Sequence, residues 1–173
     1  GTFTDTRDDQ IYKYVKIGNQ VWMAENLNYE TENSYCYDDD PANCEKYGRL
    51  YTWDAALNAC PSGWHLPTAE EFATLISNVG GEEGAAIMLK STTGWYEDGH
   101  GVDKYGFNVL PAGYRSNLGR FDIAGKYAYF WSATECTEDY ANLLGLLYSH
   151  EDALLGNLIK YDAYSVRCLR GSN

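Results

Sequence analysis

Apolar and polar residues alternate along the first part of the chain and predict a β-hairpin. Residues 11–17 (IYKYVKI) alternate, Gly18-Asn19 is a turn signal, and residues 20–23 (QVWM) resume the extended pattern. Two such runs joined by a two-residue turn that contains glycine are typical of a hairpin. We therefore expect an antiparallel strand pair near the N-terminus.

The apolar spacing changes to that of helices in the middle of the chain. Residues 52–59 (TWDAALNA) are rich in alanine and end at Cys60-Pro61, which predicts a short first helix. The stretch 68–71 (TAEE) is a capping box that opens a second helix. Gly80-Gly81 ends it. Its apolar face follows the i, i+3, i+4, i+7 pattern with Phe72, Leu75, Ile76 and Val79.

The last part of the chain consists of short strand-like stretches separated by long loops. Residues 106–115, 128–133, 143–148 and 165–169 have this character, and glycines bound the first two. Helices that come before a run of strands favour an α+β fold with mostly antiparallel sheets over a parallel α/β sheet. A length of 173 residues fits one domain, residues 1–173. The long loops indicate functional or disulfide-held segments.

The net charge and the composition limit the classes of partner that the chain can bind. Thirteen basic against 25 acidic residues give a net charge of −12, which disfavours nucleic acid as a partner. No apolar run reaches the length of about 20 residues that a transmembrane helix needs. No signal peptide opens the chain, and we expect a leader or anchor outside it. The 16 tyrosines and 5 tryptophans suit a recognition surface and equally suit a β-rich core.

Five cysteines indicate an oxidising compartment. They form no Cys-x-x-Cys pair and have no histidine at zinc-site spacing, so we expect no metal bound through sulfur. Two disulfides and one unpaired cysteine are the expected state, with several pairings open. Spacing favours only Cys36 with Cys44, which flank a polar loop.

Five ordered phrases resemble one family. They are GNQVWMAENLNY (18–29), YGRLYTWDAALNACPSGWHLPTAEEF (47–72), YGFNVLPAGYRS (105–116), YFWSATE (129–135) and SVRCLR (165–170). Together they resemble the Fibrobacter succinogenes major paralogous domain, over about residues 4–170. That family is related to the C-type lectin-like fold, in the branch that includes formylglycine-generating enzymes, and is common in secreted and cell-surface proteins.

The resemblance implies a fold, a disulfide and a place in the cell. It implies two helices packed on short sheets, with the N- and C-terminal strands adjacent. A disulfide between the first helix and the last strand is common in lectin-like folds, which pairs Cys60 with Cys168 and leaves Cys136 unpaired. For Cys136 we favour a tolerated variable position, then a bond to another chain, and last a nucleophile. The expected location is secreted or at the cell surface.

Catalytic and metal chemistry have little support in the sequence. An oxidase of the formylglycine-generating kind needs a reactive cysteine pair near the C-terminus, where only Cys168 lies. His65, His100 and His150 are far apart, and His65 is interpreted as a packed loop residue. We therefore expect no enzyme and no cofactor. The loop 38–45, with Asp38 to Asp40, Asn43 and Glu45, leaves a structural calcium site open, although a solvated acidic loop is the favoured interpretation.

The segment 136–164 is the predicted binding region. It mixes tyrosines with adaptable polar residues on loops, and Leu144, Leu154 and Leu155 are interspersed, which is typical of a ligand-binding surface. Trp95, Tyr96 and Tyr114 are expected at its rim. The predicted ligand-binding residues are Tyr140, Asn142, Tyr148, His150, Asp152, Asn157, Lys160, Tyr161, Asp162 and Tyr164.

The sequence thus predicts a ligand-binding or display module, as a monomer or as part of a larger surface protein. Its partner would be a protein or a glycan on another surface. The resemblance adds that members of this family are targets of diversity-generating retroelements, which would vary this segment. The alternative function is a structural module of a cell-surface assembly or adhesin. A formylglycine-generating-enzyme-like oxidase comes third.

Overall fold

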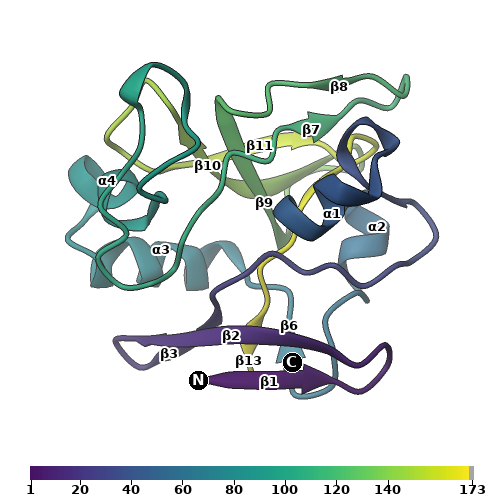
Figure 1. The fold of residues 1–173 in the computed structure, drawn as a ribbon, viewed down its shortest axis with the longest axis horizontal. Coiled ribbons are helices and arrows are strands. Elements are labelled where there is room, and N and C mark those ends of the chain that lie inside the picture. The colour runs from purple at the N-terminus through teal and green to yellow at the C-terminus, as the bar shows by residue number, and fades with distance from the viewer. Residues whose placement is uncertain (172–173) are drawn as a thin grey trace.

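The N-terminal hairpin and the end of the chain build one antiparallel sheet. A computed structural model describes residues 1–171. In it the strand order is β1-β2-β3-β13-β6, and Figure 1 shows both chain ends beside this sheet. The strands are β1 (Thr2–Asp5), β2 (Gln10–Ile17), β3 (Gln20–Met23), β6 (Trp64–His65) and β13 (Leu169–Arg170). The predicted hairpin is β2–β3.

The adjacency of the terminal strands needs one correction. Leu169 of the last strand pairs with Trp22 of β3, an early strand. The first strand, β1, lies at the edge of the sheet and pairs with β2. The chain ends therefore meet in one sheet, although the first and last strands are not neighbours.

A second sheet carries most of the predicted binding segment. Its order is β11-β10-β9-β12-β5-β4, and β12 with β9 is its parallel pair. A two-stranded ribbon, β7–β8, is drawn above β10 and β11 in Figure 1. The strands are β4 (Ser34–Tyr35), β5 (Leu50–Tyr51), β7 (Tyr114–Arg115), β8 (Phe121–Asp122), β9 (Tyr127–Glu135), β10 (Tyr140–Leu147), β11 (Leu154–Ile159) and β12 (Tyr164–Ser165).

The helices are short, and a helix begins at its predicted residue where a capping motif marks its start. Thr68 accepts from the Glu71 amide and Glu71 accepts from the Thr68 amide, so the predicted capping box is present. No helix in the described part of the chain is long and apolar enough to cross a membrane. The helices are α1 (Pro41–Tyr47), α2 (Trp53–Ala56), α3 (Ala69–Asn78) and α4 (Ala85–Leu89), with 3-10 turns η1 (Tyr37–Asp39), η2 (Glu82–Gly84) and η3 (Tyr96–Asp98).

Two apolar cores lie on the two faces of the second sheet. One holds the buried face of α3 with Trp22, and Phe130 and Leu144 of the sheet. The other holds Trp131 and Tyr51, and it includes Cys168. Side chains of β9 and β10 therefore alternate between two buried environments, which fixes their register.

Arg167 joins the chain end to the middle of the molecule. Its guanidinium is fully buried and donates to Asn26 Oδ1 at 2.7 and 3.0 Å and to the carbonyls of Met23 and Phe107. Among the described residues it has no carboxylate partner within salt-bridge distance. Desolvation lowers the pKa of Arg167 to about 9. This charge is solvated by neutral oxygens alone.

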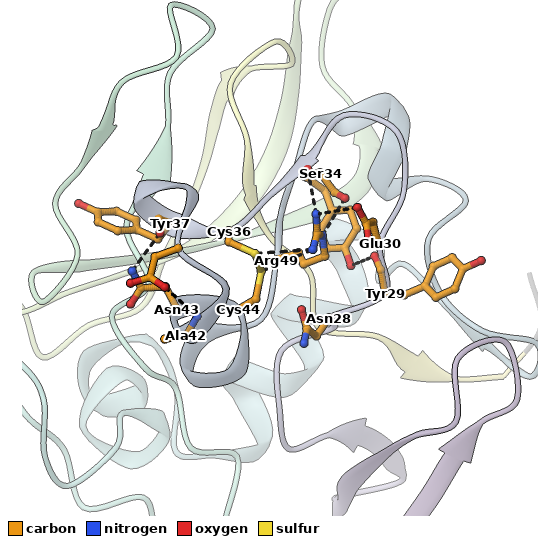
Figure 2. Close-up of a disulfide and its surroundings, with 12 residues drawn as sticks. Asn28, Tyr29, Glu30, Ser34, Cys36, Tyr37, Ala42, Asn43, Cys44 and Arg49 are labelled. Atoms are coloured by element: carbon orange, nitrogen blue, oxygen red, sulfur yellow. Dashed lines mark hydrogen bonds and ion pairs between the residues drawn. A yellow bond between two sulfur atoms is a disulfide. The ribbon is translucent and has the colours of Figure 1, made fainter.

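Both expected disulfides are present. Cys60–Cys168 ties the segment after α2 to the last strands, across a sequence separation of 108. Cys36–Cys44 links the start of η1 to α1, and Figure 2 shows Arg49 pointing toward it, with Nη1 at 3.6 Å from each sulfur. Cys136 is unpaired, as expected, and it is exposed.

Several expected elements differ from the observed ones. Residues 106–115 form no continuous strand, because Gly106 and Asn108 adopt left-handed conformations and only Val109 and β7 pair. The first helix is limited to Trp53–Ala56. Helices α1 and α4 were not predicted, and the sheet contains an unpredicted strand, β11. Residues 172–173, which the single-domain prediction includes, lie outside the described residues.

Candidate functional site

The β10–β11 hairpin separates the predicted binding residues into two groups. Tyr140 pairs with Ile159 at one end of the hairpin, and Gly145 pairs with Leu154 at the other. The connecting loop 148–153 carries Tyr148, His150 and Asp152, while the remaining residues lie toward the first end. From residue 140 to residue 148 an extended chain spans about 25 Å. The ten predicted residues therefore do not form one compact site.

The loop 148–153 is anchored to the body by a buried lysine. Lys90 Nζ donates to Leu147 O at 3.0 Å and to His150 O at 3.1 Å, and lies 5.0 Å from the Trp95 ring centroid. Burial lowers the pKa of Lys90. Tyr148 packs against the exposed Tyr96, with ring centroids 5.3 Å apart. Of this group, His150 has an exposed side chain and bonds only to the neighbouring Ser149.

Trp95 is not a rim residue. Its side chain is buried, and its indole N–H donates to Ser91 Oγ at 3.0 Å and to Val109 O at 3.2 Å. The buried Lys90 and the indole lie under the loop, and of the two neighbouring aromatic residues Trp95 and Tyr96, Tyr96 is the exposed one. The prediction that Trp95 contacts a ligand is therefore wrong.

Lys160 and Tyr164 are also buried, contrary to expectation. Lys160 is 8% exposed, because its Nζ donates to Glu135 at 2.8 Å and lies 4.5 Å from the Trp53 ring. Tyr164 is 2% exposed, because β12 lies inside the sheet and its ring packs edge-on against Trp131 at 4.8 Å. Burial raises the pKa of Tyr164. Both residues support the surface from below.

Main-chain hydrogen bonds hold the loop 160–163 against three other segments. Trp53 N donates to Lys160 O at 3.1 Å, and Lys160 N donates to Asp139 O at 2.9 Å. Arg115 and Ala163 exchange both of their main-chain bonds, at 2.8 and 3.1 Å. Since the backbone carries these contacts, they do not depend on the identity of the loop's outward side chains.

A hollow of about 270 Å³ opens where these segments meet. Tyr161 borders it and is 51% exposed, and its hydroxyl donates to Asp139 Oδ1 at 2.7 Å. That hydrogen bond to a carboxylate raises the pKa of Tyr161. Arg115 stacks its guanidinium 3.8 Å from the Tyr35 ring centroid. We call this hollow the Tyr161 hollow; its lining is Asn33, Tyr35, Thr52, Asp54, Arg115, Asn117, Lys160 and Tyr161.

The hollow combines two aromatic rings with amides, a carboxylate and a guanidinium. Asp162 lies beside it, where its Oδ1 accepts from the Asn117 amide at 2.8 Å. Asn33, Tyr35, Arg115 and Asn117 were not predicted from the sequence, because they come from strands β4 and β7 and the turns beside them, far away in sequence. No local pattern marks them, and only Asn33 stands out, with a left-handed φ of 59°.

The predicted residues on β10 and β11 lie near the hollow but outside its lining. Tyr140 is 45% exposed. Asn142 and Asn157 are cross-strand partners, so their side chains share one face of the hairpin. Tyr114, an expected rim residue, is half-buried and stacks on Tyr164 with centroids 5.6 Å apart. The Tyr161 hollow thus takes two of the ten predicted residues into its lining.

His65 and the acidic loop 38–45 make hydrogen bonds within the fold. His65 Nδ1 lies 2.7 Å from Gly171 O, and its Nε2 lies 2.9 Å from the Glu71 carboxylate, so the residue is packed as predicted but lies on strand β6 and not in a loop. Asp40 caps α1 by accepting from Ala42 N at 3.0 Å. Asn43 donates to Tyr37 O at 2.9 Å, as Figure 2 shows. Among residues 1–171 no group of three or more His, Cys, Asp or Glu is arranged to hold a metal ion.

The comparisons with known proteins identify the family. Residues 15–170 match the model of the Fibrobacter succinogenes major domain. No curated protein and no solved structure matches the chain. The family match covers most of the chain, including both halves of the Cys60–Cys168 disulfide and every residue that lines the Tyr161 hollow. The chain belongs to the Fibrobacter succinogenes major domain family.

Proposed function

We propose that this domain is a non-catalytic, extracellular ligand-binding module and that its ligand is bound at the Tyr161 hollow. One observation carries the proposal: an exposed tyrosine from the predicted binding segment converges with a stacked Arg115–Tyr35 pair. Tyrosine rings offer flat apolar area at a low cost in conformational entropy. The amides beside them donate and accept hydrogen bonds in fixed directions, and the Asp54 carboxylate accepts them.

A glycan suits this chemistry better than a flat protein surface. Sugar rings present an apolar face that stacks on aromatic rings and a rim of hydroxyls that bond to planar polar groups. The hollow offers both kinds of group within about 270 Å³. Its only cationic groups are Arg115 and Lys160, of which Lys160 is occupied by Glu135. The proposed ligand class is therefore a neutral or weakly acidic glycan, with a protein loop as the other candidate partner.

The proposal extends to the fold family and to the cellular location. Support for a C-type lectin-like fold comes from the Cys60–Cys168 bond between the segment after α2 and the last strands, and from the β3–β13 pairing. Support for an extracellular or cell-surface location comes from two disulfides in one domain. Loops framed by rigid strands are where such folds carry their variable contacts.

A glycan array tests the proposal directly. We expect the wild-type domain to bind a subset of glycans, and Tyr161→Ala to weaken that binding by about tenfold or more. Tyr140→Ala is the matched control, because Tyr140 is as exposed but lies outside the hollow. Equal binding by wild type and Tyr161→Ala, or an equal loss in Tyr140→Ala, contradicts the assignment of the site.

Diversification by a retroelement is proposed as the source of variation in residues 136–164. It is supported by exposed Leu154 and Leu155 and by the exposed, unpaired Cys136, since random variation places such residues without regard to packing. The buried Lys160 and Tyr164 are expected to be constant. Sequencing the surrounding gene checks this: a near-identical template repeat that differs at adenines supports it, and the lack of any such repeat rules it out.

A further inference from the structure

Strand β11 lies at the edge of the second sheet but has the sequence of an interior strand. Its residues, LLGNLI, include no charge and no proline. Leu154 and Leu155 are successive, so they point to opposite faces, and each is 39% exposed. Apolar residues on both faces are typical of strands that are covered on both sides. Natural edge strands usually carry a lysine, a proline or a bulge that blocks further pairing.

The main chain of β11 has hydrogen-bonding groups turned away from the sheet. Lys160 N donates to Asp139 O, which sets the phase of the alternation along the strand. By that phase the N–H groups of Leu155, Asn157 and Ile159 point away from β10. Within residues 1–171 no strand lies on that side of β11. An incoming extended chain would find these three N–H groups there and the carbonyls of Leu155 and Asn157, while Ile159 O already accepts from Asp162 N at 3.4 Å.

The two ends of this edge are acidic. The stretch 135–164 contains six carboxylates and one basic residue, Lys160, which is already paired with Glu135. Five of the carboxylates lie in the segments that precede and follow β11 and in the turn before β10, and the sixth, Glu135, ends β9. The six are Glu135, Glu138, Asp139, Glu151, Asp152 and Asp162.

We propose that β11 is a docking edge for an extended segment of another protein, apolar in its middle and basic at both ends. The segment adds as a strand beside β11, and its apolar side chains cover Leu154 and Leu155 on the two faces. Its lysines or arginines meet the carboxylates at the ends of the edge. This surface is separate from the Tyr161 hollow and does not depend on a ligand bound there.

A second copy of this chain is the less suitable occupant. Each copy carries a net charge of −12. Antiparallel pairing of two β11 strands would place Glu151 and Asp152 of one copy near Asp162 of the other. Like charges at both ends of the interface oppose that pairing. The charge pattern therefore selects a basic partner.

The experiment uses a short synthetic peptide of alternating valine and threonine with two lysines at each end. We expect it to bind and to slow hydrogen exchange of the amides of Leu155, Asn157 and Ile159. Asn157→Pro should weaken binding by about tenfold or more, because it removes an outward N–H that the sheet itself does not use. Leu118→Lys, at an apolar residue that is 81% exposed in the turn between β7 and β8, is the matched control and should bind normally.

Each other outcome overturns the proposal. If a peptide with glutamates in place of the lysines binds equally well, charge does not select the partner. If the lysine peptide binds Asn157→Pro as tightly as it binds wild type, β11 is not the docking edge. If the free domain self-associates and Asn157→Pro abolishes this self-association, the partner of β11 is a second copy of the chain. Asn157→Pro should still bind glycan, and Tyr161→Ala should still bind the peptide. These two results distinguish a failure of this proposal from a failure of the proposed function.

Discussion

The framework around Cys60–Cys168 and the segment 136–164 belong to one fold but are determined in different ways. In the framework, Arg167, Trp22 and Cys168 are fully buried, and the Arg167 guanidinium and the Cys168 sulfur each bond to a distant part of the chain. In the segment, Tyr140 and Tyr161 are about half exposed. Main-chain bonds hold the loop 160–163 in place. Side-chain identity therefore determines the framework, while the backbone determines the shape of the segment.

This difference shows how a stable domain can present a surface whose residues change. A loop held by its N–H and C=O groups keeps its conformation when outward side chains are replaced. The framework depends on the Arg167 guanidinium and the Cys60–Cys168 disulfide, so it does not keep its conformation when these side chains are replaced. Substitutions in the framework should therefore lower the free energy of unfolding more than substitutions of outward residues in the segment.

The largest effect is expected from loss of the long-range disulfide. Replacing both Cys60 and Cys168 by alanine should lower the free energy of unfolding by about 4–5 kcal/mol, because that bond closes a loop with a sequence separation of 108. The matched pair, Cys36→Ala with Cys44→Ala, spans 8 residues and should cost about 2–3 kcal/mol. Urea unfolding of both double variants measures the difference. Equal losses would show that loop closure does not explain the stability of the framework.

Arg167→Met is expected to cost about 3 kcal/mol. The methionine fills part of the space but leaves the carbonyl of Phe107 and the side chain of Asn26 without their buried donor. Arg167→Lys should recover little of this, since an ammonium cannot reproduce the planar fork. Thermal and urea unfolding give the values. A stable Arg167→Met protein would mean that the buried charge costs as much as its hydrogen bonds contribute.

Unfolding at alkaline pH should test the burial of Tyr164, which, like Lys160, belongs to the segment 136–164 by sequence and is buried in the fold. Burial raises the pKa of Tyr164, so the folded state keeps its proton above pH 10 while the unfolded state loses it. Its contribution to stability is complete below about pH 10 and falls by about 1.4 kcal/mol per pH unit above it. Buried Tyr51 acts in the same direction. Tyr164→Phe should reduce the slope of unfolding free energy against pH between 10 and 11.

The sequence could predict the framework because its signals are either local or carried by the family phrases. The capping box of Thr68 and Glu71 and the apolar face of α3 need no distant partner. Residues 106–115 were mispredicted because their extended pattern is interrupted by left-handed Gly106 and Asn108. Lysine is usually exposed, yet Lys160 is covered because Glu135 and Trp53 come together only in the fold.

The site was only partly predictable, for a physical reason. Tyr161 could be chosen from composition alone, but Asn33 and Arg115 reach the same hollow through main-chain bonds to Thr52 and Ala163. These bonds join segments that are about 20 and 50 residues apart, and a main-chain bond leaves no signature in side-chain identity. For the same reason, the sequence could not show that the predicted binding residues divide between the two ends of the β10–β11 hairpin.

The smallest effect on stability should come from the residue that matters most for binding. Tyr161→Ala should change the free energy of unfolding by less than about 0.5 kcal/mol, because its ring is half exposed and backbone bonds hold its loop. Tyr164→Ala, three positions along, should cost about 3–5 kcal/mol, since its ring packs on Trp131. Chemical unfolding of the two variants gives the ratio. If Tyr161→Ala destabilised the domain as much as Tyr164→Ala, the loop would depend on its side chains, and residues 136–164 could not vary independently of the framework.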